Sequence, residues 1–430
     1  MTEHDAPTPP AAAGLSRRGL FGLAAGAGVG GLLVGSAATA GVVAASSANQ
    51  ASAAGVHPFF GAHQAGIMTP VQDHLHFAAF DMMAGATRED LIELLQDWSY
   101  AASRMTQGLD VSATGAVGGS PEAPPDDTGE ALGLPASSLT VTFGFGPTLF
   151  RDGSGVDRFG LAGRAPAGFD ALPAFLGDDL DPTYTGGDLC VQACADDPQV
   201  AVHAIRNLSR IAFGRASLRW SQLGFGRTSR TTADQQTPRN LFGFRDGTAN
   251  ILADDEHALR DHVWVDATAG PAWLAGGSYL VARKIAMTIE TWDRVRLSEQ
   301  ERITGRAKGS GAPLSGGDEF TDPDFAATDA AGATRIDATS HVARAHPVNN
   351  AGIRLLRRGY NYVDGNTAIG RLDAGLFFLS FQNAPDRFVT VNKAVVTDLM
   401  AEYLTTIGSG VWAIPPGAAE GSYVGADLLA

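Results

Sequence analysis

The segment Asp188-Leu189-Cys190-Val191-Gln192-Ala193-Cys194-Ala195-Asp196-Asp197-Pro198 contains an apolar run that ends in a polar turn with a proline. A second segment of this kind, Leu376-Phe377-Phe378-Leu379-Ser380-Phe381-Gln382-Asn383-Ala384-Pro385-Asp386, stands near the end of the chain. Short apolar runs bounded by turn residues predict buried strands. Apolar residues at helical spacing follow each turn, and these are Val202, Ile205 and Leu208 in the first copy and Phe388, Val391 and Val395 in the second. The strand–turn–helix unit therefore occurs twice, which indicates an internal duplication.

The residues upstream of each copy extend the repeated pattern. Residues 71–83 predict a strand, and Thr87 and Asp90 have capping-box spacing before a helix whose apolar stripe is Leu91, Leu94, Leu95 and Trp98. Residues 110–138, rich in Gly, Pro, Asp and Ser, predict a loop before a strand at 139–145. A strand at 278–289 and a polar helix at 298–306 repeat the same order. We expect two halves, 57–228 and 236–430, each with an antiparallel sheet and helices on one face.

The amino-acid composition excludes several classes of function. The chain of 430 residues has 31 basic and 46 acidic side chains and a net charge of −15, which argues against a nucleic-acid partner held by phosphate contacts. Its two cysteines exclude a multi-cysteine metal site. Cys190 and Cys194 lie on one predicted strand about 13 Å apart, too far for a disulfide. We therefore expect a large, acidic, soluble enzyme or binding protein with buried free thiols.

The first residues have the features of an export signal. Ser16-Arg17-Arg18-Gly19-Leu20-Phe21 places paired arginines before a mildly apolar region, and residues 19–72 contain no charged residue. This resembles a twin-arginine signal peptide of residues 1–53, with cleavage after Ala53. The alternative is an uncleaved membrane anchor, although Gly and Ala are weak membrane formers. We expect export through the twin-arginine (Tat) translocon to a secreted, periplasmic or cell-envelope location.

Three segments of the second half contain side chains suited to a redox cofactor. In Asn240-Leu241-Phe242-Gly243-Phe244-Arg245-Asp246-Gly247-Thr248-Ala249-Asn250, an Asp between glycines permits close approach of the backbone to a ligand. Ser340-His341-Val342-Ala343-Arg344-Ala345-His346-Pro347 supplies a histidine that could be an axial metal ligand. Ile353-Arg354-Leu355-Leu356-Arg357-Arg358-Gly359-Tyr360-Asn361-Tyr362 predicts a strand with Arg354 and Arg358 on an exposed face. Arg357 lies on the apolar face and needs a partner.

Together these segments resemble the dye-decolourising peroxidases, in particular the exported, deferrochelatase/peroxidase-like branch. The shared motifs are G-x-x-D-G at Gly243–Gly247, the Ser340-His341 pair with His346-Pro347 beyond it, and the Arg-Arg-Gly-Tyr-x-Tyr segment. The similarity spans the mature chain from His63 onward. One departure is Arg344, which stands three residues after His341 where many relatives have an arginine two residues after it.

The resemblance implies an α+β fold of two duplicated ferredoxin-like domains with antiparallel sheets and peripheral helices, with haem b (iron protoporphyrin IX) bound mainly by the second. It implies His341 as the proximal iron ligand, Asp246 as the distal acid–base residue and Arg357 as its distal partner. Residues expected to border the haem are Gly247, Thr248 and Ala249 beside Asp246, and His346 and Pro347 on the proximal side, near a propionate.

These roles are chemically consistent. Peroxide must move a proton from its inner to its outer oxygen before the O–O bond breaks heterolytically, and a carboxylate can carry that proton. Arg357 stays charged and would stabilise developing negative charge. We therefore expect reduction of hydrogen peroxide with oxidation of dyes or phenolic compounds as small-molecule reductants, favoured at mildly acidic pH.

Two alternatives remain at this point. One is a deferrochelatase that releases iron from haem in an iron-uptake system, with iron-uptake components as partners. The other is a non-catalytic haem carrier, against which the Asp246 and Arg357 pair argues. A homodimer is a further candidate assembly. His74, His76 and His203 are interpreted as solvent-facing residues, since no third ligand accompanies the first two.

Overall fold

The computed structural model describes residues 55–430, so the predicted signal peptide and its cleavage site lie outside the described residues. Residues 55–430 belong to one compact unit. The boundaries proposed at 228 and 236 stay a prediction. Within residues 55–430, no helix is both long and apolar enough to cross a membrane.

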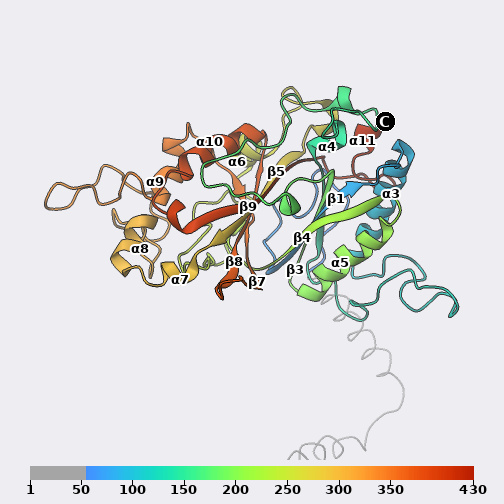
Figure 1. Cartoon of the computed structure of the whole chain (residues 1–430), viewed down its shortest axis with the longest axis horizontal. Coiled ribbons are helices and arrows are strands. Elements are labelled where there is room, and N and C mark those ends of the chain that lie inside the picture. The colour runs from blue at the N-terminus through green and yellow to red at the C-terminus, as the bar shows by residue number, and fades with distance from the viewer. Residues whose placement is uncertain (1–54) are drawn as a thin grey trace, which may run out of the picture. The chain divides into compact units, whose positions relative to one another are not determined.

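The first half has the order β-α-β-β-α-β. Its elements are β1 (His74–Met82), α3 (Arg88–Met105), β2 (Thr140–Phe145), β3 (Leu189–Ala195), α5 (Pro198–Ile211) and β4 (Ala216–Arg227). The strands are antiparallel and lie in the order β2-β3-β1-β4. Helices α3 and α5 pack against each other, and α5 covers β1 and β3 on one face of this sheet (Figure 1).

The second half repeats this topology. Its main elements are β5 (Ser278–Met287), α7 (Ile289–Trp292), α8 (Leu297–Thr304), β7 (Tyr360–Asn366), β8 (Leu372–Gln382), α10 (Pro385–Val395) and β9 (Leu404–Ile414). Its strands lie in the order β9-β5-β8-β7, which corresponds position by position to β4-β1-β3-β2 of the first half. This is the ferredoxin-like order twice over, so the predicted duplication and fold class are confirmed.

The two sheets join into one closed sheet. Strand β4 pairs with β7 through Phe225 and Asn361, and β2 pairs with β9 through Phe145 and Ala413. A core cluster fills the interior with residues from both halves, among them Phe77, Trp220, Phe377 and Trp412. A second, larger cluster lies between the sheet and helices α3 and α5.

The local predictions for the first helix are confirmed. The side chains of Thr87 and Asp90 each accept a hydrogen bond from the other's backbone N–H, and this capping box begins α3. The predicted apolar stripe is buried against the outer core. Residues 110–138 contain no helix or strand, and Cys190 and Cys194 are buried free thiols.

The remaining elements are short. They are α4 (Pro147–Phe150), η1 (Ala162–Arg164), η2 (Pro182–Tyr184), α6 (Glu256–Ala258), η3 (Leu259–Val263), η4 (Ala272–Leu274), α9 (His341–Ala345), η5 (Pro347–Asn349), β6 (Leu356–Arg357), η6 (Ala401–Tyr403) and α11 (Ala426–Leu429). Three of them, α9, β6 and η6, hold or adjoin the residues of the candidate site.

The prediction that Arg358 lies on an exposed strand face is wrong. Strands β6 and β7 keep one register against β8 on either side of Arg358 and Gly359, since Arg357 pairs with Ser380 and Tyr360 with Phe377. Arg358 is fully buried and donates from Nη1 to the carbonyl oxygens of Thr69 (2.6 Å) and Ile67 (3.4 Å). Alternation therefore places Arg358 on the inward face with Tyr360 of the inner core, and it places Arg357 on the opposite face, where it reaches the site.

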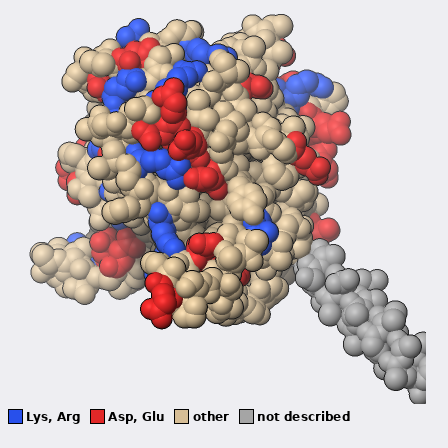
Figure 2. Space-filling model, turned by 90° about the vertical axis from the view of Figure 1, so that its right-hand side faces the viewer, with Lys and Arg blue, Asp and Glu red and all other residues tan. Residues whose placement is uncertain are grey.

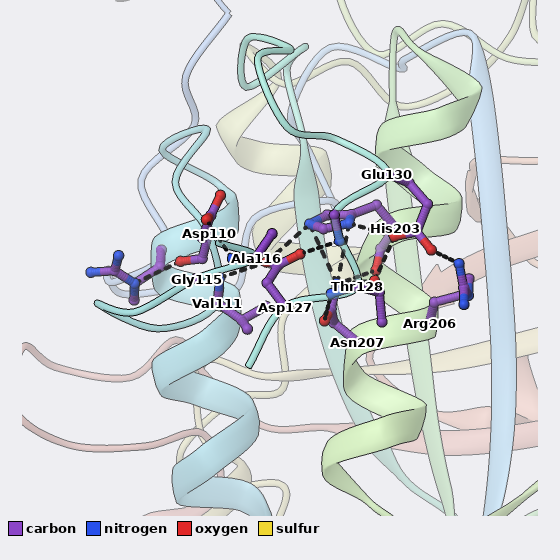
Figure 3. A network of polar contacts seen from close by, with 12 residues as sticks. Asp110, Val111, Gly115, Ala116, Asp127, Thr128, Glu130, His203, Arg206 and Asn207 are labelled. Carbon is purple, nitrogen blue, oxygen red and sulfur yellow. Dashed lines mark hydrogen bonds and ion pairs between the residues drawn. The ribbon is translucent and has the colours of Figure 1, made fainter. Parts of the chain in front are cut away.

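The prediction that His203 faces solvent is also wrong. Its side chain is buried because the long loop at 110–138 folds over α5 (Figure 3). His203 Nδ1 lies 3.0 Å from Glu130 Oε2, and Nε2 lies 3.5 Å from Asp127 Oδ2. Burial lowers the pKa of His203, although the Asp127 carboxylate acts in the opposite direction.

His76 likewise does not behave as a solvent-facing residue. It lies half-buried on β1, and its Nδ1 has no hydrogen-bond partner among the described residues. Burial lowers the pKa of His76 to about 4. Within residues 55–430 no group of three or more His, Cys, Asp or Glu residues is arranged to hold a metal ion.

Candidate haem site

Asp246 lies in a tight loop between β4 and α6. Its backbone N–H donates to the carbonyl of Pro238 (2.9 Å), which fixes the loop at this residue. The next residue, Gly247, has φ +88°, and a Cβ there would lie 2.6 Å from the Cα of Ser229. Only glycine fits this position without displacing the backbone of the neighbouring segment. The loop therefore presents Asp246 in one defined place.

Asp246 and Arg357 form the pair that the sequence predicted. Arg357 Nη1 donates to Asp246 Oδ1 at 2.7 Å, and the other carboxylate oxygen accepts from Asn240 Nδ2 at 3.3 Å. The side chains are 16% exposed for Asp246 and 30% exposed for Arg357. Arg357 is thus half-buried and has the partner it requires. Both groups keep a surface open to a ligand.

Asn250 holds the two segments together, and the sequence did not indicate this role. Its Oδ1 accepts from the backbone N–H of Arg357 (2.7 Å), and its Nδ2 donates to the Arg357 carbonyl (2.9 Å). Nδ2 also donates to the carbonyl of Arg230 (2.8 Å). Asn250 is buried, so these bonds are shielded from water. An amide that binds a backbone 107 residues away leaves no local pattern in the sequence.

His341 begins the short helix α9, directly after Ser340 at the N-cap. Its Nδ1 lies 2.6 Å from Asp398 Oδ2, and because an ionised carboxylate only accepts, Nδ1 carries the proton. Asp398 is fully buried in its side chain, and its Oδ1 accepts from the backbone N–H groups of Met400 (2.8 Å) and Ala401 (2.9 Å). The imidazole is therefore held in one orientation and tautomer, with Nε2 available as a ligand atom.

Asp398 was missed by the sequence reasoning. It lies between α10 and η6, 57 residues after His341, and no spacing rule connects the two. The departure at Arg344 left open which residue supports His341, and in the structure Asp398 forms the hydrogen bond to its imidazole.

The charges around His341 connect the two sides of the site. Removal from water acts to lower the pKa of His341, but the Asp398 carboxylate outweighs it and raises that pKa above its ordinary value. Asp246 contributes in the same direction as Asp398, and Arg357 opposes it. His341 therefore lies close enough to the Asp246–Arg357 pair to respond to both charges. The fold brings together the three residues that the sequence selected.

The other predicted site residues have varied positions. Thr248 Oγ1 donates to Glu319 Oε1 at 3.2 Å, and Ala249 is exposed. His346 packs edge-on against Phe325, and its Nδ1 accepts from the backbone N–H of Val348 (3.3 Å). Pro347 begins η5 directly after it.

The residues present fit a haem group. A neutral imidazole supported by a buried carboxylate is a suitable axial ligand for iron. The side chain of His341 is 33% exposed, whereas that of its partner Asp398 is fully buried. One edge of the imidazole ring therefore faces open space. Beside it, Ser340 Oγ and Arg344 Nε are buried without a hydrogen-bond partner among the described residues. Orphaned polar atoms of this kind are accounted for when a further polar group binds next to them.

The fold and this donor set define a haem-binding α+β protein built from two ferredoxin-like sheets. Comparison with protein-family models supports this description for both halves of the chain. Residues 64–226 match the family model described as "Dyp-type peroxidase, N-terminal", and residues 237–419 match "Dyp-type peroxidase, C-terminal". The chain therefore belongs to the Dyp-type peroxidase family, and it is a haem peroxidase.

Individual relatives support the same assignment over most of the chain. The deferrochelatase of Shigella sonnei is 36% identical over 378 residues, which are 86% of this chain and 87% of that protein. The deferrochelatase of Escherichia coli K12 is 35% identical over 377 residues, with the same coverage of both chains. Among solved structures, an oxyferrous complex of DtpA from Streptomyces lividans has a TM-score of 0.79 and 39% identity, covering 88% of this chain and 99% of that one. The DyP-type peroxidase from Cellulomonas bogoriensis has a TM-score of 0.77 and 37% identity, covering 87% and 98%.

Proposed function

We propose that His341 is the axial ligand of the haem iron, that Asp246 is the acid–base residue of peroxide reduction and that Arg357 is its electrostatic partner. The observation that carries the proposal is the His341–Asp398 hydrogen bond of 2.6 Å beside the Asp246–Arg357 pair. Bound haem supplies the iron at which peroxide is reduced and the oxidising equivalents that pass to a dye or phenolic reductant.

In this proposal the protein's own groups carry the proton. The carboxylate of Asp246 accepts a proton from one peroxide oxygen and returns it to the other, which becomes the leaving oxygen. Positioned acid–base catalysis of this kind contributes roughly 10²–10⁴-fold. Arg357 does not exchange protons, but its guanidinium lies 2.7 Å from Asp246 and stabilises negative charge that develops on the peroxide. Asn250, through the Arg357 backbone, keeps the guanidinium facing the carboxylate.

The ligand assignment is tested by haem titration of His341→Ala and Asp398→Ala. We expect His341→Ala to abolish stable haem binding or shift the Soret band. Asp398→Ala should weaken haem affinity by about 10- to 100-fold, because a lost partner leaves the imidazole unsupported. An unchanged Soret band and affinity in His341→Ala would move the axial ligand to another residue.

The second candidate function is deferrochelation, which the names of the 35–36% identical relatives favour. It would release iron from haem and leave the tetrapyrrole intact. Purified protein should be given hydrogen peroxide with a dye, and separately protohaem with a ferrous chelator. Dye turnover with no release of metal-free porphyrin supports the peroxidase as the working activity, and porphyrin release supports deferrochelation.

We propose further that the chain is exported through the Tat translocon after haem is inserted in the cytoplasm. The supporting feature is the paired Arg17-Arg18 before an apolar region without charged residues. Replacing both arginines by lysines should retain the protein in the cytoplasm. Export of that variant at the normal level would contradict a twin-arginine signal.

A further inference from the structure

Glu319 connects the long segment between α8 and α9 to the loop that carries Asp246. Its carboxylate contacts two residues of that loop: Oε2 accepts from Arg245 Nη1, and Oε1 accepts from Thr248 Oγ1 at 3.2 Å. Arg245 directly precedes Asp246, and Thr248 follows it by two residues. One buried carboxylate, 8% exposed, therefore binds both sides of the acid–base residue.

The main chain at Glu319 is itself held in place. Buried Arg306 donates from Nη1 to the carbonyl oxygens of Glu319 (2.8 Å) and Gly311 (2.8 Å). The next residue, Phe320, lies under the guanidinium of Arg230, whose Cζ is 4.5 Å from the ring centroid. Arg230 belongs to the segment after β4, and its carbonyl accepts from Asn250. The main chain at Glu319 is thus held by Arg306, and the next side chain by Arg230, in addition to the two contacts that the carboxylate makes with the Asp246 loop.

The surrounding space leaves the Arg245–Glu319 pair little freedom. Gly311 has φ +79°, and a Cβ there would lie 2.7 Å from Arg245 Cδ and 3.3 Å from Glu319 Cγ. A buried ion pair contributes little net stability, since desolvation offsets the attraction. Its value here is geometric, because a displacement of about 1 Å at a reacting group can cost roughly 100-fold in rate.

We propose that Glu319 is a positioning residue for Asp246, holding its loop from both sides so that the carboxylate meets Arg357 and bound peroxide in one geometry. The inference rests on the proposed acid–base role of Asp246. The segment between α8 and α9 then carries the residue that positions Asp246 and also connects to His341.

The test uses Glu319→Gln in the full-length holoprotein, which keeps the side-chain size and an acceptor for Thr248 but removes the charge that Arg245 binds. We expect normal haem content and a 10- to 100-fold slower Soret change after stopped-flow mixing with peroxide. In the haem-free protein, amide hydrogen exchange of residues 238–250 should become faster. The matched control is Glu299→Gln, which removes the carboxylate of another Glu–Arg pair, formed with Arg302 away from Asp246, and should change neither readout.

An Asp246→Asn background separates positioning from general loss of structure. If Glu319 acts through Asp246, adding Glu319→Gln to Asp246→Asn slows the peroxide reaction no further. An additional slowing in the double variant, or wild-type rate and exchange in Glu319→Gln, would overturn the inference. If Asp246→Asn alone reacts at the wild-type rate, the proposed role of Asp246 fails, while exchange of residues 238–250 still reports whether Glu319 holds the loop. Should Glu319→Gln fold poorly, Thr248→Ala removes one of the two contacts, and a wild-type exchange rate there would also contradict the proposal.

Discussion

At the scale of single residues, the site separates two tasks between two carboxylates. The Asp398 side chain is fully buried and satisfied by two backbone N–H groups and His341, so it holds the His341 imidazole in one orientation. Asp246 is partly exposed and faces a guanidinium, so it can meet a substrate. Residue type alone could not assign these roles, because the difference lies in burial and in the partners of each oxygen.

The first prediction concerns Asp246. Replacement by Asn keeps the shape but removes the group that carries the proton, so the peroxide reaction should slow by about 10²–10⁴-fold while haem is retained. Stopped-flow mixing with peroxide measures the rate, and the Soret absorbance measures haem content. Asp255→Asn is a suitable control because Asp255 forms a comparable pair with Arg354 outside the site (3.1 Å). A rate equal to that of the control would transfer the proton role to water or another residue.

The second prediction concerns pH and His76. Since burial lowers its pKa in the folded state to about 4 from an ordinary 6.5, the unfolded chain binds a proton that the folded chain rejects between these values. Stability from this group is therefore present above pH 6.5 and is lost as the pH falls towards 4, at up to roughly 1.4 kcal/mol per pH unit. Urea unfolding from pH 7 to 4 should show a weaker decline in His76→Gln than in the wild type or in His74→Gln. Parallel declines in all three proteins would show that other groups control acid stability.

At the scale of elements, the alternation of faces along β6 and β7 decides which arginine reaches the site. The sequence pattern assigned Arg358 to an exposed face, whereas β6 and β7 keep one register against β8 and the face that Arg358 shares with Leu356 and Tyr360 meets the inner core. Arg357 then pairs with Asp246, and the side chain of Arg358 enters the interior. There it satisfies carbonyl groups of the segment that leads to β1.

The third prediction follows from this burial. Arg358→Ala should lower the free energy of unfolding by about 3–5 kcal/mol, because it opens a cavity and leaves buried carbonyl oxygens without donors. Arg354→Ala removes a half-exposed arginine that forms an ion pair with Asp255 at 3.1 Å, and it should cost about 1 kcal/mol or less. Chemical denaturation of the two variants tests the difference. Equal costs would mean that the contacts of Arg358 contribute no more than a surface pair.

At the scale of the whole molecule, the two halves share one interior. The Phe77 ring of β1 lies 5.3 Å from that of Phe377 on β8 and 5.3 Å from that of Trp412 on β9. Basic and acidic side chains are intermixed on the face in Figure 2 and do not form separate patches. The chain has a net charge of −15, but this face has no continuous acidic surface that would select cationic substrates.

The fourth prediction concerns independent folding. Because the inner core draws on both halves and β4–β7 and β2–β9 close the sheet, an isolated half exposes two strand edges and half of a core. A fragment of residues 236–430 should therefore lack a cooperative unfolding transition, unlike the chain of residues 55–430. Circular dichroism during thermal unfolding measures this. A sharp transition in the fragment would show that the second half is self-sufficient.

The sequence by itself determined the repeated strand–turn–helix units, the capping box of α3 and, through family motifs, the three residues expected to do the chemistry. These features depend on neighbours within a few positions, where side-chain pattern and backbone propensity act directly. Only the tertiary structure decided that Asp398 supports His341, that Asn250 binds the Arg357 backbone and that Arg358 is buried. These contacts join residues far apart in the chain, and the closing of two sheets into one brings them together. Periodicity carries no information about such pairings, because it reports which face a residue occupies and not what that face meets.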